Sequence, residues 1–117
     1  MAAIAFVSPI LAGKQEAWRR FCQKLLGSRR CEYEESRKRM GITKELAWLH
    51  HGQGAYEGDV AIVYLEVEYP AQLVQQLLTS EHPFDRWFRQ QLLELYGLDQ
   101  AYPSICQLNE LVFAWHV

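Results

Sequence analysis

The side chains best suited to chemistry in this sequence are the imidazoles of its four histidines. His50 lies in a predicted strand, on the same side as Trp48, and Tyr64 is expected on that side of a neighbouring strand. In such an aromatic setting a histidine can act as a general base toward an acidic C–H or O–H group, or it can bind haem iron. His50 and Tyr64 are therefore the candidate catalytic residues. The alternative is a histidine at a strand end that only forms hydrogen bonds.

The sequence predicts no metal site, no cofactor and no disulfide framework. No two histidines share one face at a metal-binding spacing, since His50 and His51 point to opposite sides of their strand. The three cysteines are an odd number and form no C-x-x-C motif. This usage favours a reducing, cytoplasmic location. Cys31 follows two arginines, so it is the cysteine whose surroundings best suit reactivity.

Charge is distributed unevenly along the chain, although the net charge is only −2. Residues 14–44 contain ten basic and four acidic side chains, whereas residues 45–117 contain two basic and ten acidic ones. Within residues 29–39, acids and bases recur at i,i+4 spacing, as for Arg30 and Glu34. Such self-pairing is typical of a solvated helix face and argues against a nucleic-acid interface.

The helix over residues 29–39 is therefore expected on the surface, where Arg37 or Arg39 could rim a cavity and hold a carboxylate. Another exposed pair, Asp85 with Arg89, is expected on a later helix. Exposed pairs contribute only about 0.2–1 kcal/mol each. Replacing either rim arginine is accordingly predicted to change stability little.

Hydrophobic patterns predict one α+β domain over residues 1–117. The apolar N-terminus favours a first strand over a signal peptide, because no basic residue precedes it. No apolar run approaches the roughly 20 residues that a membrane span needs. The predicted strands span residues 2–8, 42–51, 60–68 and 109–117, and the predicted helices span residues 14–26 and 28–40 and begin at Pro70 and Pro83.

This order of elements matches the ferredoxin-like plan, a four-stranded antiparallel sheet with helices on one face. Helices cover one face only, yet both sides of the strands are apolar. The aromatic side would be an exposed patch larger than monomers usually carry, so we expect a homodimer, sheet against sheet around a cavity. Small residues such as Ala3, Ala5 and Val7 are expected under the helices. The residues expected to line the dimer cavity are Phe6, Trp48, Ile62, Phe113 and Trp115.

In element order and strand pattern, nearly the whole chain resembles the dimeric α/β-barrel group of ferredoxin-like proteins. That group includes antibiotic-biosynthesis monooxygenase-like proteins, muconolactone isomerases, haem-degrading monooxygenases and stress-responsive barrels. Residues 35–49 and 82–91 resemble more closely a small family of uncharacterised bacterial proteins with this fold. No catalytic motif of the characterised proteins aligns with this chain, so the resemblance implies a dimeric barrel and assigns no residue a role.

Two functions stay open at this point. An aromatic-lined cavity with few polar groups favours binding of a small aromatic or acidic molecule, which a cofactor-independent monooxygenase or isomerase could use as its substrate. The alternative is a non-catalytic binding or regulatory homodimer whose aromatic sheet face is only the interface. The expected partner in both cases is a second copy of the chain, with neither nucleic acid nor membrane involved.

Overall fold

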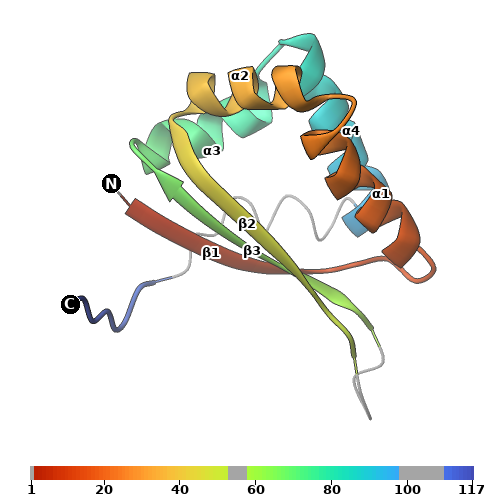
Figure 1. Cartoon of the computed structure of the whole chain (residues 1–117), viewed down its shortest axis with the longest axis horizontal. Helices are drawn as coiled ribbons and strands as arrows, with labels where there is room; N and C mark the ends of the chain where they lie inside the picture. Colours follow the sequence, from red (N-terminus) through yellow and green to blue (C-terminus); the bar gives the residue numbers. More distant parts are fainter. Residues whose placement is uncertain (1, 53–57, 98–109) are drawn as a thin grey trace.

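The computed structural model describes residues 2–52, 58–97 and 110–117 of the chain. These residues form an α+β fold in which three strands and four helices follow one another along the chain (Figure 1). The predicted helices and the first three predicted strands are confirmed to within about two residues at each end. The elements are Ala2–Pro9 (β1), Gln15–Leu26 (α1), Arg30–Met40 (α2), Ile42–His50 (β2), Val60–Val67 (β3), Pro70–Thr79 (α3) and Pro83–Tyr96 (α4).

The three strands form one antiparallel sheet in the order β1-β3-β2. The helices form a layer over one face of this sheet, with α1 and α4 side by side (Figure 1). Every second residue of the central strand β3, from Ala61 to Val67, is buried beneath the helices, and the residues between them face away. The sheet therefore has an inner face toward the helices and an outer face on the opposite side.

Local sequence signals set several of the helix ends. α2 stops at Gly41, whose φ of 72° lies in the left-handed region that glycine adopts without strain. Pro70 and Pro83 occupy the first turns of α3 and α4, where a missing N–H breaks no helical hydrogen bond. All three positions were predicted from the sequence, and the structure confirms them.

Residues 110–117 form no regular secondary structure, which corrects the predicted fourth strand over residues 109–117. They lie beside the sheet on the side of the N-terminus (Figure 1); residue 109 is outside the described residues. Phe113 and Trp115 are 80% and 73% exposed, so neither packs against the sheet as predicted. Alternating apolar residues favour a strand, but a strand also needs an edge to pair with, and the alternation does not specify one.

The face predicted for β1 is also wrong. Ile4 and Ser8 are buried beneath the helices and Phe6 is half-buried on the same side, whereas Ala3 and Val7 face outward. The pattern of β1 is apolar on both sides, so hydropathy alone does not choose between them. The volume of the side chains decides which side faces the helices, because the larger side chains fill the space between the sheet and the helices.

Two apolar clusters between the sheet and the helices make up the core. The larger cluster includes side chains of α1 and α4, and a hydrogen bond of 2.8 Å from the indole N–H of Trp18 to the hydroxyl of Tyr96 links these helices inside it. The smaller cluster lies between the sheet and α3. Its buried members are Ile4, Met40, Ile42, Val63, Leu65, Val67 and Leu73.

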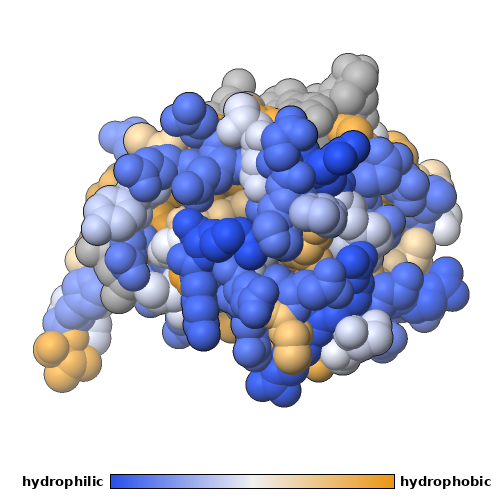
Figure 2. Space-filling model, turned by 90° about the horizontal axis from the view of Figure 1, so that it is seen from above, coloured by the Kyte–Doolittle hydropathy of each residue, from blue (hydrophilic) through white to orange (hydrophobic). Residues whose placement is uncertain are grey.

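α2 is not the fully exposed helix that its charges predicted. Ser36, Arg37 and Met40 are buried on one side of it. The predicted i,i+4 pair of Arg30 with Glu34 does form on the other side, at 2.8 Å. Figure 2 shows the surface above the helices, where hydrophilic residues predominate. One side of α2 is therefore solvated, and the other packs against the rest of the fold.

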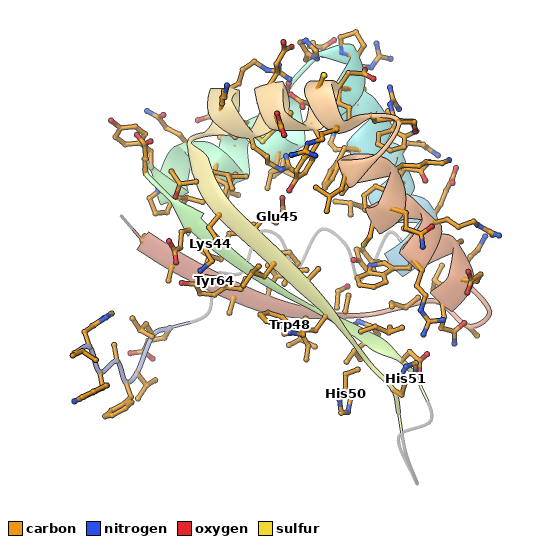
Figure 3. The ribbon with its side chains drawn as sticks, viewed as in Figure 1. Lys44, Glu45, Trp48, His50, His51 and Tyr64 are labelled. Atoms are coloured by element: carbon orange, nitrogen blue, oxygen red, sulfur yellow. The ribbon has the colours of Figure 1, made fainter. Side chains whose placement is uncertain are left out.

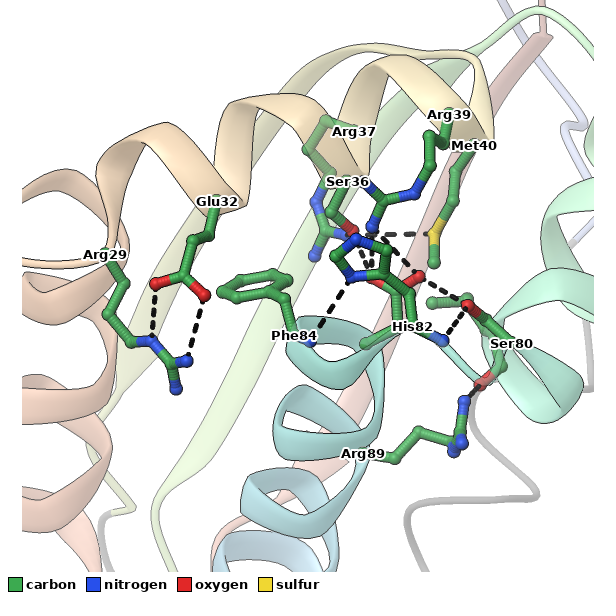
Figure 4. Close-up of polar contacts among 12 residues, drawn as sticks. Arg29, Glu32, Ser36, Arg37, Arg39, Met40, Ser80, His82, Phe84 and Arg89 are labelled. Carbon is green, nitrogen blue, oxygen red and sulfur yellow. Dashed lines mark hydrogen bonds and ion pairs between the residues drawn. The ribbon is translucent and has the colours of Figure 1, made fainter.

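The carboxylate of Asp85 ties α4 to α2. It is 3% exposed and accepts hydrogen bonds from the hydroxyls of Ser36 at 2.5 Å and Ser80 at 2.6 Å. Arg39 donates to both of its oxygens at 3.2 Å (Figure 4). The predicted pair with Arg89 is wrong, since Arg89 donates to a backbone carbonyl of α3. Burial alone would raise the pKa of Asp85, but these hydrogen bonds and the charge of Arg39 outweigh it and lower the pKa.

Replacing Asp85 with asparagine is expected to lower the free energy of unfolding by about 1–3 kcal/mol at pH 7, because the buried hydroxyl of Ser36 and the partly buried donors of Ser80 and Arg39 lose a charged acceptor. The pKa is lower in the folded chain than in the unfolded one, so the ionised carboxylate stabilises the fold fully only above about pH 4. This contribution is lost as the pH falls through the folded-state pKa.

Urea unfolding between pH 7 and pH 3 measures this effect. The difference in the free energy of unfolding between the unaltered chain and Asp85→Asn should become smaller toward acid pH. Glu81→Gln, at an exposed acid just before α4, is the control and should show almost no difference at any pH. A difference for Asp85→Asn that stays constant with pH would contradict the prediction.

Candidate functional site

A cavity of about 400 Å³ lies between the inner face of the sheet and helices α1, α2 and α4. Most of its described wall is apolar and aromatic, and polar side chains enter it at a few positions. Apolar side chains in the wall include Phe6, Trp18, Phe21, Val63, Leu65 and Phe88. The polar side chains that matter for its chemistry are Ser8, Cys22, Tyr33, Arg37 and Glu45.

A β-bulge decides which side chains of β2 face this cavity. Ile42 pairs with Val67 of β3 and Lys44 with Glu66, so one extra residue of β2 sits between these two pairs. Beyond the bulge, Glu45 turns toward the helices, whereas Lys44 and every second residue after it turn outward (Figure 3). The bulge therefore places Ile42 and Glu45 on the same inner face, although they are three positions apart.

The polar wall of the cavity centres on an ion pair between α2 and β2. Nε of Arg37 donates to Oε1 of Glu45 at 2.8 Å, and the side chains are 8% and 19% exposed. The hydroxyl of Tyr33 donates to the same oxygen. Burial alone would lower the pKa of Arg37, but the negative charge of Glu45 outweighs it and raises the pKa. Arg37 and Glu45 therefore neutralise each other inside the fold.

Two aromatic rings hold the guanidinium of Arg37 in place. Its central carbon lies 4.7 Å from the ring centre of Tyr33 and 4.5 Å from that of Phe88, within cation–π range. Burial and the charge of Glu45 raise the pKa of Tyr33, and Arg37 offsets only part of this. Tyr33 therefore stays protonated at neutral pH and keeps a hydroxyl hydrogen to donate.

Two further polar groups of the wall come from β1 and α1. Ser8 is 1% exposed, and its hydroxyl oxygen has no hydrogen-bond partner in the part of the chain that the structure describes. A buried hydroxyl without a partner is uncommon, because it loses its bonds to water and gains none in return. Burial, with a contribution from Glu45, raises the pKa of the Cys22 thiol to about 11, so this thiol is protonated at neutral pH. Ser8 is thus the group of the wall that most lacks a partner.

The predicted catalytic pair lies outside this cavity. His50 and Tyr64 share the outer face of the sheet, as predicted, and so do Trp48 and Ile62 (Figure 3). His50 pairs with Val60, four positions from Tyr64, so the two side chains are about 13 Å apart along the strands. They do not meet at one reacting atom.

The remaining predicted site residues are scattered. Phe6 lines the cavity, but from the inner face instead of the outer one. Phe113 and Trp115 are exposed and belong to no described pocket wall. Arg37 lines the cavity as a buried, paired cation, whereas Arg39 pairs with Asp85 of α4 and is not part of the described cavity wall. Neither arginine forms the open rim that the sequence predicted.

The polar groups that the structure brings together differ from the site residues predicted from the sequence. Glu45 shares its side of β2 with Ala47 and Leu49, and an acid on an otherwise apolar side of a strand is a signal that was available. Tyr33 and Ser8 are not among the site residues predicted from the sequence. Their proximity to Glu45 or to a cavity depends on how α2 and β1 pack, which sequence spacing does not reveal.

No known protein family, no curated protein and no solved structure matches the chain. In the described ranges, no three His, Cys, Asp or Glu side chains gather as metal ligands would. No helix of those ranges is both long and apolar enough to cross a membrane. The chemistry of the cavity itself therefore has to indicate the function.

Replacing Arg37 with alanine is expected to lower the free energy of unfolding by about 3 kcal/mol, because Glu45 would be left as an unpaired charge in an apolar wall. This reverses the small effect that the sequence predicted. Thermal unfolding should show a midpoint lower by about 10 °C. Lys38→Ala, at the next residue of α2 with an exposed side chain, should change it little. Equal midpoints for the two variants would show that Arg37 is solvated.

Proposed function

We propose that this chain binds a small, planar and largely apolar molecule in the cavity between its sheet and its helices. The observation that carries the proposal is an aromatic cavity whose wall contains the buried hydroxyl of Ser8, to which no described residue forms a hydrogen bond. A bound molecule with one polar group would supply the missing hydrogen bond. The volume of about 400 Å³ lies within the usual range of small-molecule sites.

A neutral fluorescent probe, N-phenyl-1-naphthylamine, tests this proposal. The probe should gain fluorescence on binding the unaltered chain. Ala47→Phe places a ring in the cavity wall and should weaken binding at least tenfold, whereas Leu46→Phe adds a ring on the opposite face and should not. No fluorescence gain with the folded, unaltered chain, or equal weakening by both variants, would overturn the cavity as the binding site.

Catalysis on that molecule, as a monooxygenase or an isomerase, stays a prediction. His50 and Tyr64 lie on the outer face, and the hydroxyl of Tyr64 donates to Glu66 at 2.7 Å. This hydrogen bond raises the pKa of Tyr64, so the phenol is a proton donor and not a base at neutral pH. Binding without catalysis requires none of these groups, which is why binding is the function proposed.

We further propose that the outer face of the sheet packs against a second copy of the chain, as in a ferredoxin-like dimeric barrel. Val7, Leu46 and Trp48 are 53%, 40% and 51% exposed there. Val7 and Trp48 both pair with Ile62 of the central strand, so they lie on either side of it. Leu46 lies two residues before Trp48 on the same strand. A patch of this kind on a sheet favours self-association.

Replacing Trp48 with lysine should therefore convert dimers into monomers, because a charge would be buried at the centre of the contact. Native mass spectrometry of the unaltered chain at micromolar concentration should show the dimer, and Trp48→Lys should show mainly the monomer. Tyr69→Lys, at an aromatic residue with 58% exposure outside the strands, is the control that should remain dimeric. A folded, unaltered chain that is monomeric would refute this second proposal.

A further inference from the structure

A second open group of the cavity, besides the hydroxyl of Ser8, is the carboxylate of Glu45. Its Oε1 accepts hydrogen bonds from Tyr33 and Arg37, whereas Oε2 has no partner among the described residues. The side chain points into the space between the sheet and the helices (Figure 3). A carboxylate can accept about four hydrogen bonds, so Glu45 keeps capacity for a donor on a bound molecule.

The guanidinium of Arg37, by contrast, is already engaged. Its Nε donates to Glu45 and its Nη1 to the hydroxyl of Ser36 at 3.3 Å. The rings of Tyr33 and Phe88 lie against its central carbon. A second carboxylate beside Arg37 would bring two negative charges to one cation, and one of the two would then stay uncompensated in an apolar wall.

The other titratable groups that line the cavity add no negative charge and no open cation. Burial is the main cause that raises the pKa of Cys22, Tyr33 and Tyr96, and Glu45 raises each of them further. These three groups come from α1, α2 and α4 and are all protonated at neutral pH. Arg19 is 46% exposed and pairs with Glu16 at 3.4 Å on α1. The ion pair of Arg37 with Glu45 is therefore the buried charge pair of the cavity, and Oε2 of Glu45 is its open acceptor.

We infer that the cavity selects a neutral aromatic molecule that carries an O–H or N–H donor, a phenol or an aromatic amine, which donates to Oε2 of Glu45. The inference rests on the proposed small-molecule binding and names the class of ligand. Charge supports it, because a neutral donor can bond to Oε2, whereas an aromatic acid would add a second negative charge beside the single cation of Arg37. This reverses the acidic ligand that the arginines of α2 suggested in the sequence.

Three molecules of nearly equal size and shape test this inference on the unaltered chain: 2-naphthol, naphthalene and 2-naphthoate. Isothermal titration at neutral pH should show 2-naphthol binding about tenfold to a hundredfold tighter than naphthalene, the gain expected from one hydrogen bond to a charged group. The acid 2-naphthoate should bind more weakly than naphthalene, because its carboxylate would lose its hydration beside a cation that Glu45 already compensates.

Glu45→Gln removes the charge and keeps the shape of the side chain. This variant should reduce the preference for 2-naphthol over naphthalene to about threefold or less and strengthen the binding of 2-naphthoate. Glu81→Gln, at an exposed acid just before α4 that does not line the cavity, should leave the order of affinities unchanged. If Glu45→Gln fails to fold because Arg37 becomes unpaired, the double variant Arg37→Met with Glu45→Gln removes both charges and should likewise lose the preference.

The outcomes separate this inference from the function on which it rests. Binding of none of the three molecules to the unaltered chain would overturn both. Tightest binding of 2-naphthoate would identify Arg37 as the anchor and overturn the inference alone. Equal binding of 2-naphthol and naphthalene, or a preference that Glu45→Gln leaves intact, would also overturn the inference and keep the cavity as a binding site.

Discussion

The cavity depends on the ion pair between Arg37 of α2 and Glu45 of β2. Neither charge could remain in an apolar wall alone, since an unpaired buried charge costs several kcal/mol. The pair therefore fixes the helix against the strand at a single distance, 2.8 Å between Nε and Oε1. The rings of Tyr33 and Phe88 restrict the guanidinium further, from α2 and α4. Because three elements meet at this point, the polar wall of the cavity has one defined geometry.

Compared with an apolar core, a buried ion pair of this kind adds little to the free energy of unfolding. Apolar side chains of similar volume often stabilise a core as well or better, because two charges must lose their hydration when the chain folds. The pair matters here for ligand binding. It holds a hydrogen-bond acceptor, Oε2 of Glu45, in an aromatic cavity, and it compensates the positive charge of Arg37. The carboxylate of Asp85, which joins α2 to α4, differs from Glu45 because all of its described partners are structural contacts.

Sequence patterns predicted the elements well and their contacts poorly. Periodicity, the two helix-starting prolines and Gly41 are local signals, so the helices and three strands follow from them. The partner of Asp85 is not local: Arg89 lies at i,i+4 on the same helix, yet Arg39 lies 46 positions away and binds it. Burial of Arg37 was missed for a similar reason, because α2 is polar on nearly every side and only its packing shows which side is covered. The prediction of a fourth strand was wrong because alternating apolar residues favour a strand but do not specify which edge of the sheet it would pair with.

The bulge in β2 separates two kinds of chemistry on one sheet. Without the extra residue near Thr43, strand alternation would place Ile42 on the same face as Leu46 and Trp48. With it, Ile42 closes the core beside Val67 while Glu45 reaches the cavity, and the aromatic outer face is left free of buried charge. The ligand-binding and self-association surfaces proposed here are thus the two sides of the same strands. A molecule bound on the inner face and a second copy on the outer face would not compete for any side chain.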